Sequence, residues 1–186
     1  MLGKGLMKMR KKFQDDYGFF PLTWMLPSEY SEFRLYFESK PKGKCRTYIV
    51  KPEALSQGKG IFLTRRIEDI PSGEHLVVQR YLTKPYLLDG LKFDFRIYVL
   101  IASVDPLRLY LYNEGLARFA TENYIAPTSE NMGEVCMHLT NYAINKDNPK
   151  FVFNRSDKDM TVGHKKSVTA VFELLATKGV DVPKLK

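Results

Sequence analysis

The chain has 186 residues, of which 44% are hydrophobic and 13% are aromatic, and its formal net charge is +8. This composition is typical of a globular domain, excludes an intrinsically disordered chain, and includes no apolar run as long as a membrane span. The two cysteines, Cys45 and Cys136, form no metal-binding or redox motif and indicate a reducing compartment. Nucleic acid is the general partner expected for a basic chain, but no recognition-helix, zinc or RNP-type motif supports it.

The first part of the chain is predicted to be helical. Apolar residues recur at helical spacing over residues 2–13 and predict a helix that faces a core. Residues 21–27, which run from one proline to another, are predicted to be extended. Ser28 is expected to cap a short helix over residues 29–37. A loop at residues 41–44 then leads into the strands that dominate the middle of the chain.

The first motif with a chemical meaning is a strand-like run that ends at Lys51 and is followed by a turn at residues 56–61. Gly58 and Gly60 let backbone N–H groups approach an anion closely, and Lys59 adds positive charge between them. The turn differs from the P-loop motif of NTPases, and by itself it is better explained as a plain hairpin turn. Together with Lys51 and the polar strand described below, it predicts a clamp for phosphate groups.

A second motif lies where a buried strand, residues 75–82, becomes polar at Gln79. A strand that ends at a hinge leaves backbone N–H and C=O groups free, and such groups can contact the edge of an adenine. Tyr81 and Leu82 are then expected to pack against the face of the ring. An ordinary strand end is the alternative, and by itself it explains the pattern better.

The most informative segment begins at Lys92 and continues as an apolar strand. Because side chains alternate along a strand, the odd-numbered residues from Phe93 to Val99 are expected in a core. Lys92, Asp94 and Arg96 then share the opposite face. A lysine, a carboxylate and a guanidinium on one face suit phosphate oxygens and sugar hydroxyls. The alternative is an antiparallel sheet with one solvated face.

The rest of the chain is predicted to extend this sheet and to close it with a helix. Residues 107–112 pair back on the preceding strand through Asp105-Pro106, and residues 116–120 continue the sheet. A polar loop precedes the segment 138–141, and an apolar stripe predicts a final helix over residues 167–176. The fold class expected is α+β, as one unit with a central antiparallel sheet and flanking helices.

These motifs resemble, in order and spacing, those of the tubulin tyrosine ligase-like family, and most closely those of its polyglutamylases. The segments that carry the resemblance are Lys51-Pro52 and residues 57–61, 79–82, 92–96 and 138–142. The resemblance extends from about Lys8 to the C-terminal helix. It implies an ATP-grasp fold and an ATP-dependent ligase that adds glutamate to glutamate side chains in tubulin tails.

The resemblance also implies which residues bind ATP. Lys51 and Lys92 would hold its phosphate groups, and Asp94 would lie on the ribose side. Arg96 would stabilise the transferred phosphoryl group, so that Lys92 and Arg96 would be catalytic. The residues implied to bind the nucleotide are Lys51, Gln57, Gly58, Lys59, Gly60, Gln79, Arg80, Tyr81, Leu82, Lys92, Phe93, Asp94, Thr140 and Asn141.

For the second substrate, free L-glutamate, the resemblance implies that Arg118 binds its carboxylate, with Tyr142 and Lys166 as further contacts. The chemistry implied is carboxylate activation, in which ATP phosphorylates a glutamate side chain of tubulin and the amine of free glutamate displaces phosphate. The basic charge of the chain suits the acidic tails of tubulin and microtubules through electrostatic steering. These partners imply a cytoplasmic and cytoskeletal location, with the cilium or basal body as a further one, and neither membrane nor nucleic acid.

One part of the family pattern is missing. Mg²⁺ is expected for the family, which holds it with a Glu-x-Asn segment, but nothing after Lys166 matches that segment. Glu173 and Asp181 lie in the wrong context to replace it. We therefore expect residues 1–186 to be the central part of the catalytic domain, incomplete at both ends, without the N-terminal lobe and the metal-binding end. A non-catalytic nucleotide- or microtubule-binding remnant, and a glycine- or tyrosine-adding relative, are the alternatives.

Overall fold

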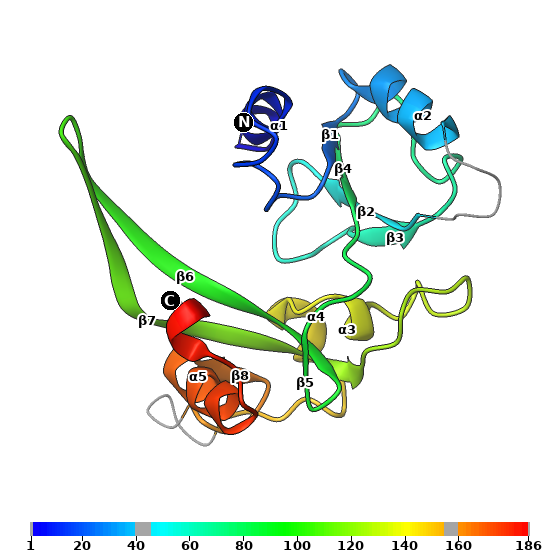
Figure 1. Cartoon of the computed structure of the whole chain (residues 1–186). Helices are drawn as coiled ribbons and strands as arrows, with labels where there is room; N and C mark the ends of the chain where they lie inside the picture. Colours follow the sequence, from blue (N-terminus) through cyan, green and yellow to red (C-terminus); the bar gives the residue numbers. More distant parts are fainter. Residues whose placement is uncertain (1, 40–45, 155–159, 186) are drawn as a thin grey trace. The chain divides into compact units, whose positions relative to one another are not determined.

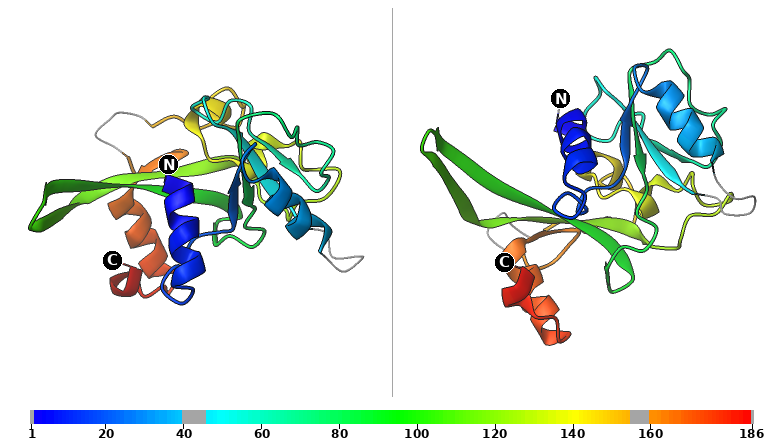
Figure 2. Two further views of the ribbon diagram at one scale, coloured as in Figure 1. Left: turned by 90° about the horizontal axis from the view of Figure 1, so that it is seen from above. Right: turned by 45° about the horizontal axis from the view of Figure 1, so that its top comes forward.

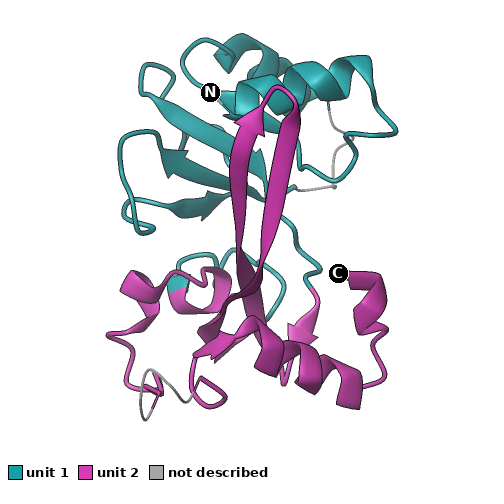
Figure 3. Ribbon diagram, turned by 90° about the vertical axis from the view of Figure 1, so that its left-hand side faces the viewer, with its two compact units in different colours: residues 1–85, 125–135 teal, residues 86–124, 136–186 magenta. Residues whose placement is uncertain are grey.

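The computed structural model describes residues 2–39, 46–154 and 160–185, with the elements labelled in Figure 1 and seen from two further sides in Figure 2. The expected loop at residues 41–44 and Cys45 lie outside these residues. The chain forms two compact units: unit 1 is residues 1–85 and 125–135, and unit 2 is residues 86–124 and 136–186 (Figure 3). Each unit is built on its own four-stranded antiparallel sheet. The prediction of helices with antiparallel strands is confirmed, and the prediction of one unit with one central sheet is wrong.

The described part of unit 1 packs its helices against a sheet with the strand order β1-β4-β2-β3. Its core is aromatic, since Trp24 and Tyr48 each pack against Phe33 with ring centroids 5.3 Å apart. Burial among these rings raises the pKa of Tyr48 to about 12. The elements are α1 (Leu2–Lys12), β1 (Thr23–Met25), α2 (Tyr30–Glu38), β2 (Tyr48–Pro52), β3 (Phe62–Thr64) and β4 (Leu76–Arg80).

Both helices predicted for this unit form, with small shifts at their ends. α1 ends at Lys12, and α2 begins at Tyr30. The predicted cap at Ser28 is wrong: its Oγ donates to the carbonyl oxygen of Met25 over 3.0 Å, and no side chain caps the N-terminus of α2. A serine hydroxyl can bond to a nearby carbonyl instead of a helix N–H, and the sequence alone does not distinguish the two.

Unit 2 is organised around a sheet with the strand order β5-β6-β7-β8, on which α5 packs. Ser167 caps the N-terminus of α5, because its Oγ accepts a hydrogen bond from the backbone N–H of Ala170 over 3.0 Å. Val171 and Leu175 of this helix pack with Phe119 of the sheet. Of the helices that the structure describes, none has the length and apolar character needed to cross a membrane. The elements are β5 (Leu87–Leu88), β6 (Leu91–Val104), β7 (Leu107–Asn123), α3 (Val135–His138, which starts at the unit boundary), α4 (Tyr142–Asn145), β8 (Lys165–Ser167), α5 (Val168–Thr177) and the 3₁₀ helix η1 (Val182–Leu185).

β6 and β7 form a long hairpin, and only its base lies in the core. Phe93 pairs with Phe119 across the hairpin, and the two rings stack with centroids 5.3 Å apart. Nearer the tip the side chains are exposed, including 43% of Ile97 and 57% of Val99. The core prediction is therefore confirmed for Phe93 and Phe95 and wrong for Ile97 and Val99. The reason is that, among the described elements of unit 2, α5 packs on the base, and the hairpin extends beyond it (Figures 1 and 2).

Candidate functional site

Lys51 is the centre of a polar network that crosses three strands of unit 1. Its Nζ donates to Oε1 of Gln79 on β4 over 2.9 Å. Nε2 of Gln79 in turn donates to Oγ1 of Thr23 on β1 over 2.8 Å. Burial lowers the pKa of the Lys51 ammonium below its usual value. β1, β4 and β2 thus hold one partly desolvated cation in a fixed position.

This network gives the side chain of Gln79 a role in orienting Lys51. The predicted adenine contact concerned the backbone groups of residues 79–82, so the side-chain bond does not test it. The sequence gives no signal for Thr23, because its place beside Gln79 depends on the register between β1 and β4. An ammonium group has three donors, so Lys51 can keep this contact and still bind an anion.

The turn at residues 57–60 joins the paired strands β2 and β3. Gln57, Gly58 and Gly60 have φ angles of 62°, 89° and 68°. A Cβ atom on Gly60 would lie 3.0 Å from Cγ of Pro52, and the left-handed backbone there also favours glycine. Lys59 is exposed. The predicted hairpin is therefore present, and its closure over a phosphate stays a prediction.

The strand end at residues 79–82 differs from the predicted hinge. The N–H groups of Arg80 and Tyr81 each donate to a backbone carbonyl oxygen of unit 1, over 2.8 and 3.0 Å. These two groups are therefore not free to contact an adenine edge. Tyr81 is only 5% exposed and belongs to the core, whereas Leu82 is 63% exposed and can pack against a ligand.

The candidate site of unit 2 is centred on an ion pair between neighbouring strands. Asp94 of β6 and Arg118 of β7 are register partners. Nε of Arg118 donates to Oδ1 of Asp94 over 2.9 Å, and Nη2 of Arg118 donates to Oδ2. These hydrogen bonds raise the pKa of Arg118. Asp94 thus orients Arg118, which retains the N–H groups of Nη1 for another acceptor.

A second cation flanks Arg118 on its other side. Lys165 of β8 is the register partner of Arg118, whereas Lys166 is the partner of Ala117. Lys166 therefore lies on the opposite face, with its Nζ 5.9 Å from the centroid of the Phe119 ring. The structure separates Lys166 from Arg118, contrary to the prediction, and brings Lys165 next to it. The difference of one residue arises because the loop before β8 leaves the register between β7 and β8 undetermined by the sequence.

The charges do not balance on the face of the unit 2 sheet that carries Asp94, Arg118 and Lys165. Like charges directly opposite each other on neighbouring strands destabilise a sheet, and Arg118 and Lys165 are such a pair. Asp94 compensates only one of them, and Lys92 and Arg96 lie on the same face of β6. A bound carboxylate or phosphate would remove the repulsion, because it pairs with both cations.

Lys92 connects this face to the segment 138–142. Its Nζ donates to the carbonyl oxygen of His138 over 2.8 Å, and His138 itself is fully buried. The side chain of Asn141 forms no cap for α4, which begins at the next residue. The other predicted site residues of the unit are the buried Thr140, the exposed Tyr142 and Arg96, and Phe93, whose ring lies in the core.

Asn145 holds this segment to β7, and the sequence pattern gives no sign of it. Its Oδ1 accepts hydrogen bonds from the backbone N–H and the Oγ1 of Thr121 over 3.0 and 2.9 Å. Its Nδ2 donates to the carbonyl oxygens of Leu139 and Asn141 over 2.8 and 3.0 Å. One fully buried amide thus fixes the backbone on both sides of Thr140.

The chemistry of these groups points to anions. Within the described ranges, no group of three or more His, Cys, Asp or Glu side chains is placed to hold a metal ion. Each unit instead carries lysine or arginine side chains that oxygen acceptors of the protein hold in place. Such sites suit phosphate and carboxylate groups.

The chain belongs to the tubulin-tyrosine ligase family, whose profile matches residues 1–183. It is similar to a Tetrahymena thermophila protein named probable beta-tubulin polyglutamylase, with 60% identity over 184 residues, which are 99% of this chain and 15% of that protein. It is 50% identical to the Mus musculus tubulin polyglutamylase TTLL13 over 171 residues, 92% of this chain and 20% of the relative. It is 43% identical to the Mus musculus tubulin polyglutamylase TTLL6 over 185 residues, 100% of this chain and 22% of the relative. The chain thus spans 15% to 22% of the length of these relatives.

Replacement of the buried amide tests its role in the site. We expect Asn145→Ala to lower the free energy of unfolding by about 2–4 kcal/mol, because several buried backbone groups lose their partners. The exposed Asn113 is a matched control, and Asn113→Ala should change the same quantity by less than about 0.5 kcal/mol. Urea unfolding followed by circular dichroism measures both values. Equal effects of the two substitutions would contradict the role of Asn145.

Proposed function

We propose that this chain is the nucleotide- and glutamate-binding part of an ATP-dependent ligase with the ATP-grasp fold, which adds glutamate to glutamate side chains in tubulin tails. The observation that carries the proposal is the uncompensated positive charge around Asp94, Arg118 and Lys165, beside Lys92. The names of the three relatives support tubulin as the protein substrate and glutamate as the added residue. These partners imply a cytoplasmic location at the cytoskeleton.

Two lysines are proposed as ligands of the ATP phosphates. Lys51 and Lys92 neutralise phosphate oxygens, and the turn at residues 57–60 contributes Lys59 and backbone N–H groups. The exposed Arg96 stabilises charge on the phosphoryl group during its transfer. The chemistry of these donors suits the phosphate groups of ATP. Lys51 is partly desolvated, and pairing with an anion stabilises a charged group most strongly when water is excluded from it. The further nucleotide contacts proposed are Leu82, Thr140 and Asn141, since the N–H groups of Arg80 and Tyr81 already bond within unit 1.

For glutamate, the guanidinium of Arg118 is proposed to donate to two acceptors. The edge formed by Nε and Nη2 holds Asp94, and Nη1 binds the carboxylate of the incoming amino acid. Lys165 adds a second cation from the neighbouring strand. Tyr142, on the segment that receives Lys92, is a further contact.

The reaction proposed has two steps. The terminal phosphoryl group of ATP passes to a carboxylate oxygen of the acceptor glutamate, and ADP leaves. The amine of the incoming glutamate then attacks the carboxyl carbon, so that a C–N bond forms, the C–O bond to phosphate breaks, and the amine releases a proton. The residues named above neutralise the anions and align the amine with the carbon.

Substitution of Arg118 tests the glutamate site. The test uses a chimera in which this chain replaces the aligned 184 residues of the Tetrahymena relative. Incorporation of labelled glutamate into microtubules by the chimera is measured. We expect Arg118→Lys to reduce incorporation at least about thirtyfold, roughly 2 kcal/mol, because lysine cannot hold Asp94 and a carboxylate together. Binding of ATP should stay within about twofold of the unsubstituted chimera. Arg108→Lys, near the exposed hairpin tip, is the matched control and should change neither quantity.

Each other outcome has a definite meaning. Loss of ATP binding in Arg118→Lys would assign Arg118 to the phosphate site, and unchanged incorporation would make it surface charge. Incorporation of labelled glycine or tyrosine in place of glutamate by the unsubstituted chimera would contradict the choice of amino acid. ATP binding without any incorporation would favour the non-catalytic alternative.

The pKa of Lys51 gives a pH dependence for ATP binding. Burial lowers this pKa in the free protein, and a bound phosphate raises it again because the opposite charge favours the ammonium form. At a pH above the lowered pKa, Lys51 must take up a proton on binding, so ATP affinity should fall as pH rises through that value. Isothermal titration in buffers of different ionisation enthalpy measures both the affinity and the proton uptake. Lys51→Arg should bind without this uptake, and an unchanged uptake in the variant would contradict the assignment.

A further inference from the structure

We infer that α1 and the pocket beside it bind an acidic peptide that carries an apolar side chain among its carboxylates. The inference deepens the proposed function and rests on it, because it gives an acidic protein substrate a contact surface in unit 1, apart from the phosphate-binding lysine Lys51.

α1 is a helix of one charge sign. Its sequence from Leu2 to Lys12 contains lysines and an arginine and no acidic residue. Lys4, Lys8 and Lys11 follow the spacing i, i+4, i+7 and therefore lie along one side of the helix. In the part of the chain that the structure describes, neither Lys4 nor Lys8 forms an ion pair, and both are exposed.

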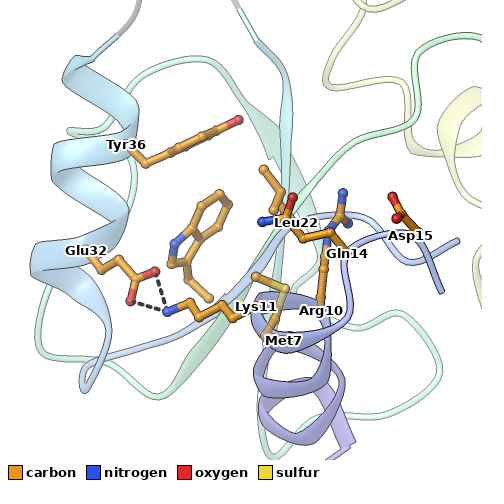
Figure 4. Close-up of a pocket in the computed structure, with 9 residues that line it drawn as sticks. Met7, Arg10, Lys11, Gln14, Asp15, Leu22, Glu32 and Tyr36 are labelled. Carbon is orange, nitrogen blue, oxygen red and sulfur yellow. Dashed lines mark hydrogen bonds and ion pairs between the residues drawn. The ribbon is translucent and has the colours of Figure 1, made fainter. Parts of the chain in front are cut away.

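The lysine row, formed by Lys4, Lys8 and Lys11, ends at a pocket. Lys11 is a lining residue of a pocket of about 510 Å³, a size typical of ligand sites. Figure 4 shows Lys11 reaching Glu32 of α2 at one side of it, and the ammonium lies 3.0 and 3.2 Å from the two carboxylate oxygens. Both side chains of this pair are largely exposed, so it contributes little to stability and can exchange partners. The lining residues are Met7, Arg10, Lys11, Gln14, Asp15, Leu22, Trp24, Glu32 and Tyr36.

The pocket and the lysine row offer different chemistry. The charges of the pocket lining balance, since it contains two basic residues, Arg10 and Lys11, and two acidic ones, Asp15 and Glu32. Arg10 also donates to a backbone carbonyl oxygen. The rest of the lining is mainly apolar or aromatic, which favours an apolar side chain. The row outside carries excess positive charge, which favours carboxylates. A ligand that satisfies both has acidic residues next to an apolar one.

An extended peptide fits this surface better than a nucleic acid. Lys4 and Lys8 are separated by about 6 Å along the helix axis, close to the roughly 6.7 Å between side chains on one side of an extended peptide. Bases need exposed aromatic faces for stacking. Trp24 is only 3% exposed, and its ring packs against that of Tyr36 with centroids 4.9 Å apart. The aromatic rings of the pocket are therefore occupied with each other.

Fluorescence anisotropy tests this inference directly. The probe is a short labelled peptide rich in glutamate with one central phenylalanine, titrated with the full chain at low ionic strength. Combined replacement Lys4→Gln, Lys8→Gln and Lys11→Gln should weaken binding about fivefold to tenfold or more, the sum of several exposed charge pairs. The control Arg108→Gln, Lys146→Gln and Lys184→Gln removes the same charge from exposed positions in unit 2 and should change affinity less than about twofold.

Further titrations distinguish the outcomes that would contradict the inference. A peptide with glycine in place of phenylalanine should bind the unsubstituted chain more weakly, and equal affinity would remove the pocket from the proposal. Equal losses in the two triple variants would show general charge attraction and overturn the docking surface. Tighter binding of a single-stranded RNA of similar charge, lost in the α1 variant, would assign the surface to nucleic acid. ATP binding measured on the same variants keeps the proposed function separate, because the α1 substitutions should leave it unchanged.

Discussion

The pairing of β6 with β7 is the interaction on which the rest of unit 2 depends. Phe93 and Phe119 stack on one face of the pair, while Asp94 and Arg118 form their ion pair on the other. Because side chains alternate with a period of two, a shift of one residue would exchange the faces and bury the charges. Core packing therefore fixes the register that builds the polar site.

In unit 1, too, a buried residue and a polar site residue are neighbours on one strand. Val50 is buried, and its neighbour Lys51 meets Gln79 across the sheet. In both units oxygen acceptors of the protein orient a cation: the amide of Gln79 holds Lys51, the carboxylate of Asp94 holds Arg118 and the carbonyl of His138 holds Lys92. Groups that are already oriented need no reorganisation when an anion binds, which is the condition for efficient electrostatic stabilisation.

The alternation from Lys92 to Arg96 could be predicted from the sequence, because it is a local property of one strand. The partner of Asp94 could not, since Arg118 meets it through a register set by packing between distant segments. The same limit explains why Lys165, and not Lys166, lies beside Arg118. The apolar residues near the hairpin tip show another limit: an apolar pattern indicates that a strand can be covered, and it does not indicate what covers it.

The central claim is that Asp94, Arg118 and Lys165 form a site for a carboxylate. The most direct measurement is a titration of the unmodified, ¹⁵N-arginine-labelled chain with L-glutamate, observing the side-chain resonances of Arg118 by NMR. The Nη resonances of Arg118 should shift and saturate, while the Nε resonance, bonded to Asp94, changes little. Arg34, which forms an exposed ion pair with Glu38 on α2, should not respond. Saturable shifts elsewhere in the chain with unchanged Arg118 resonances would contradict the claim.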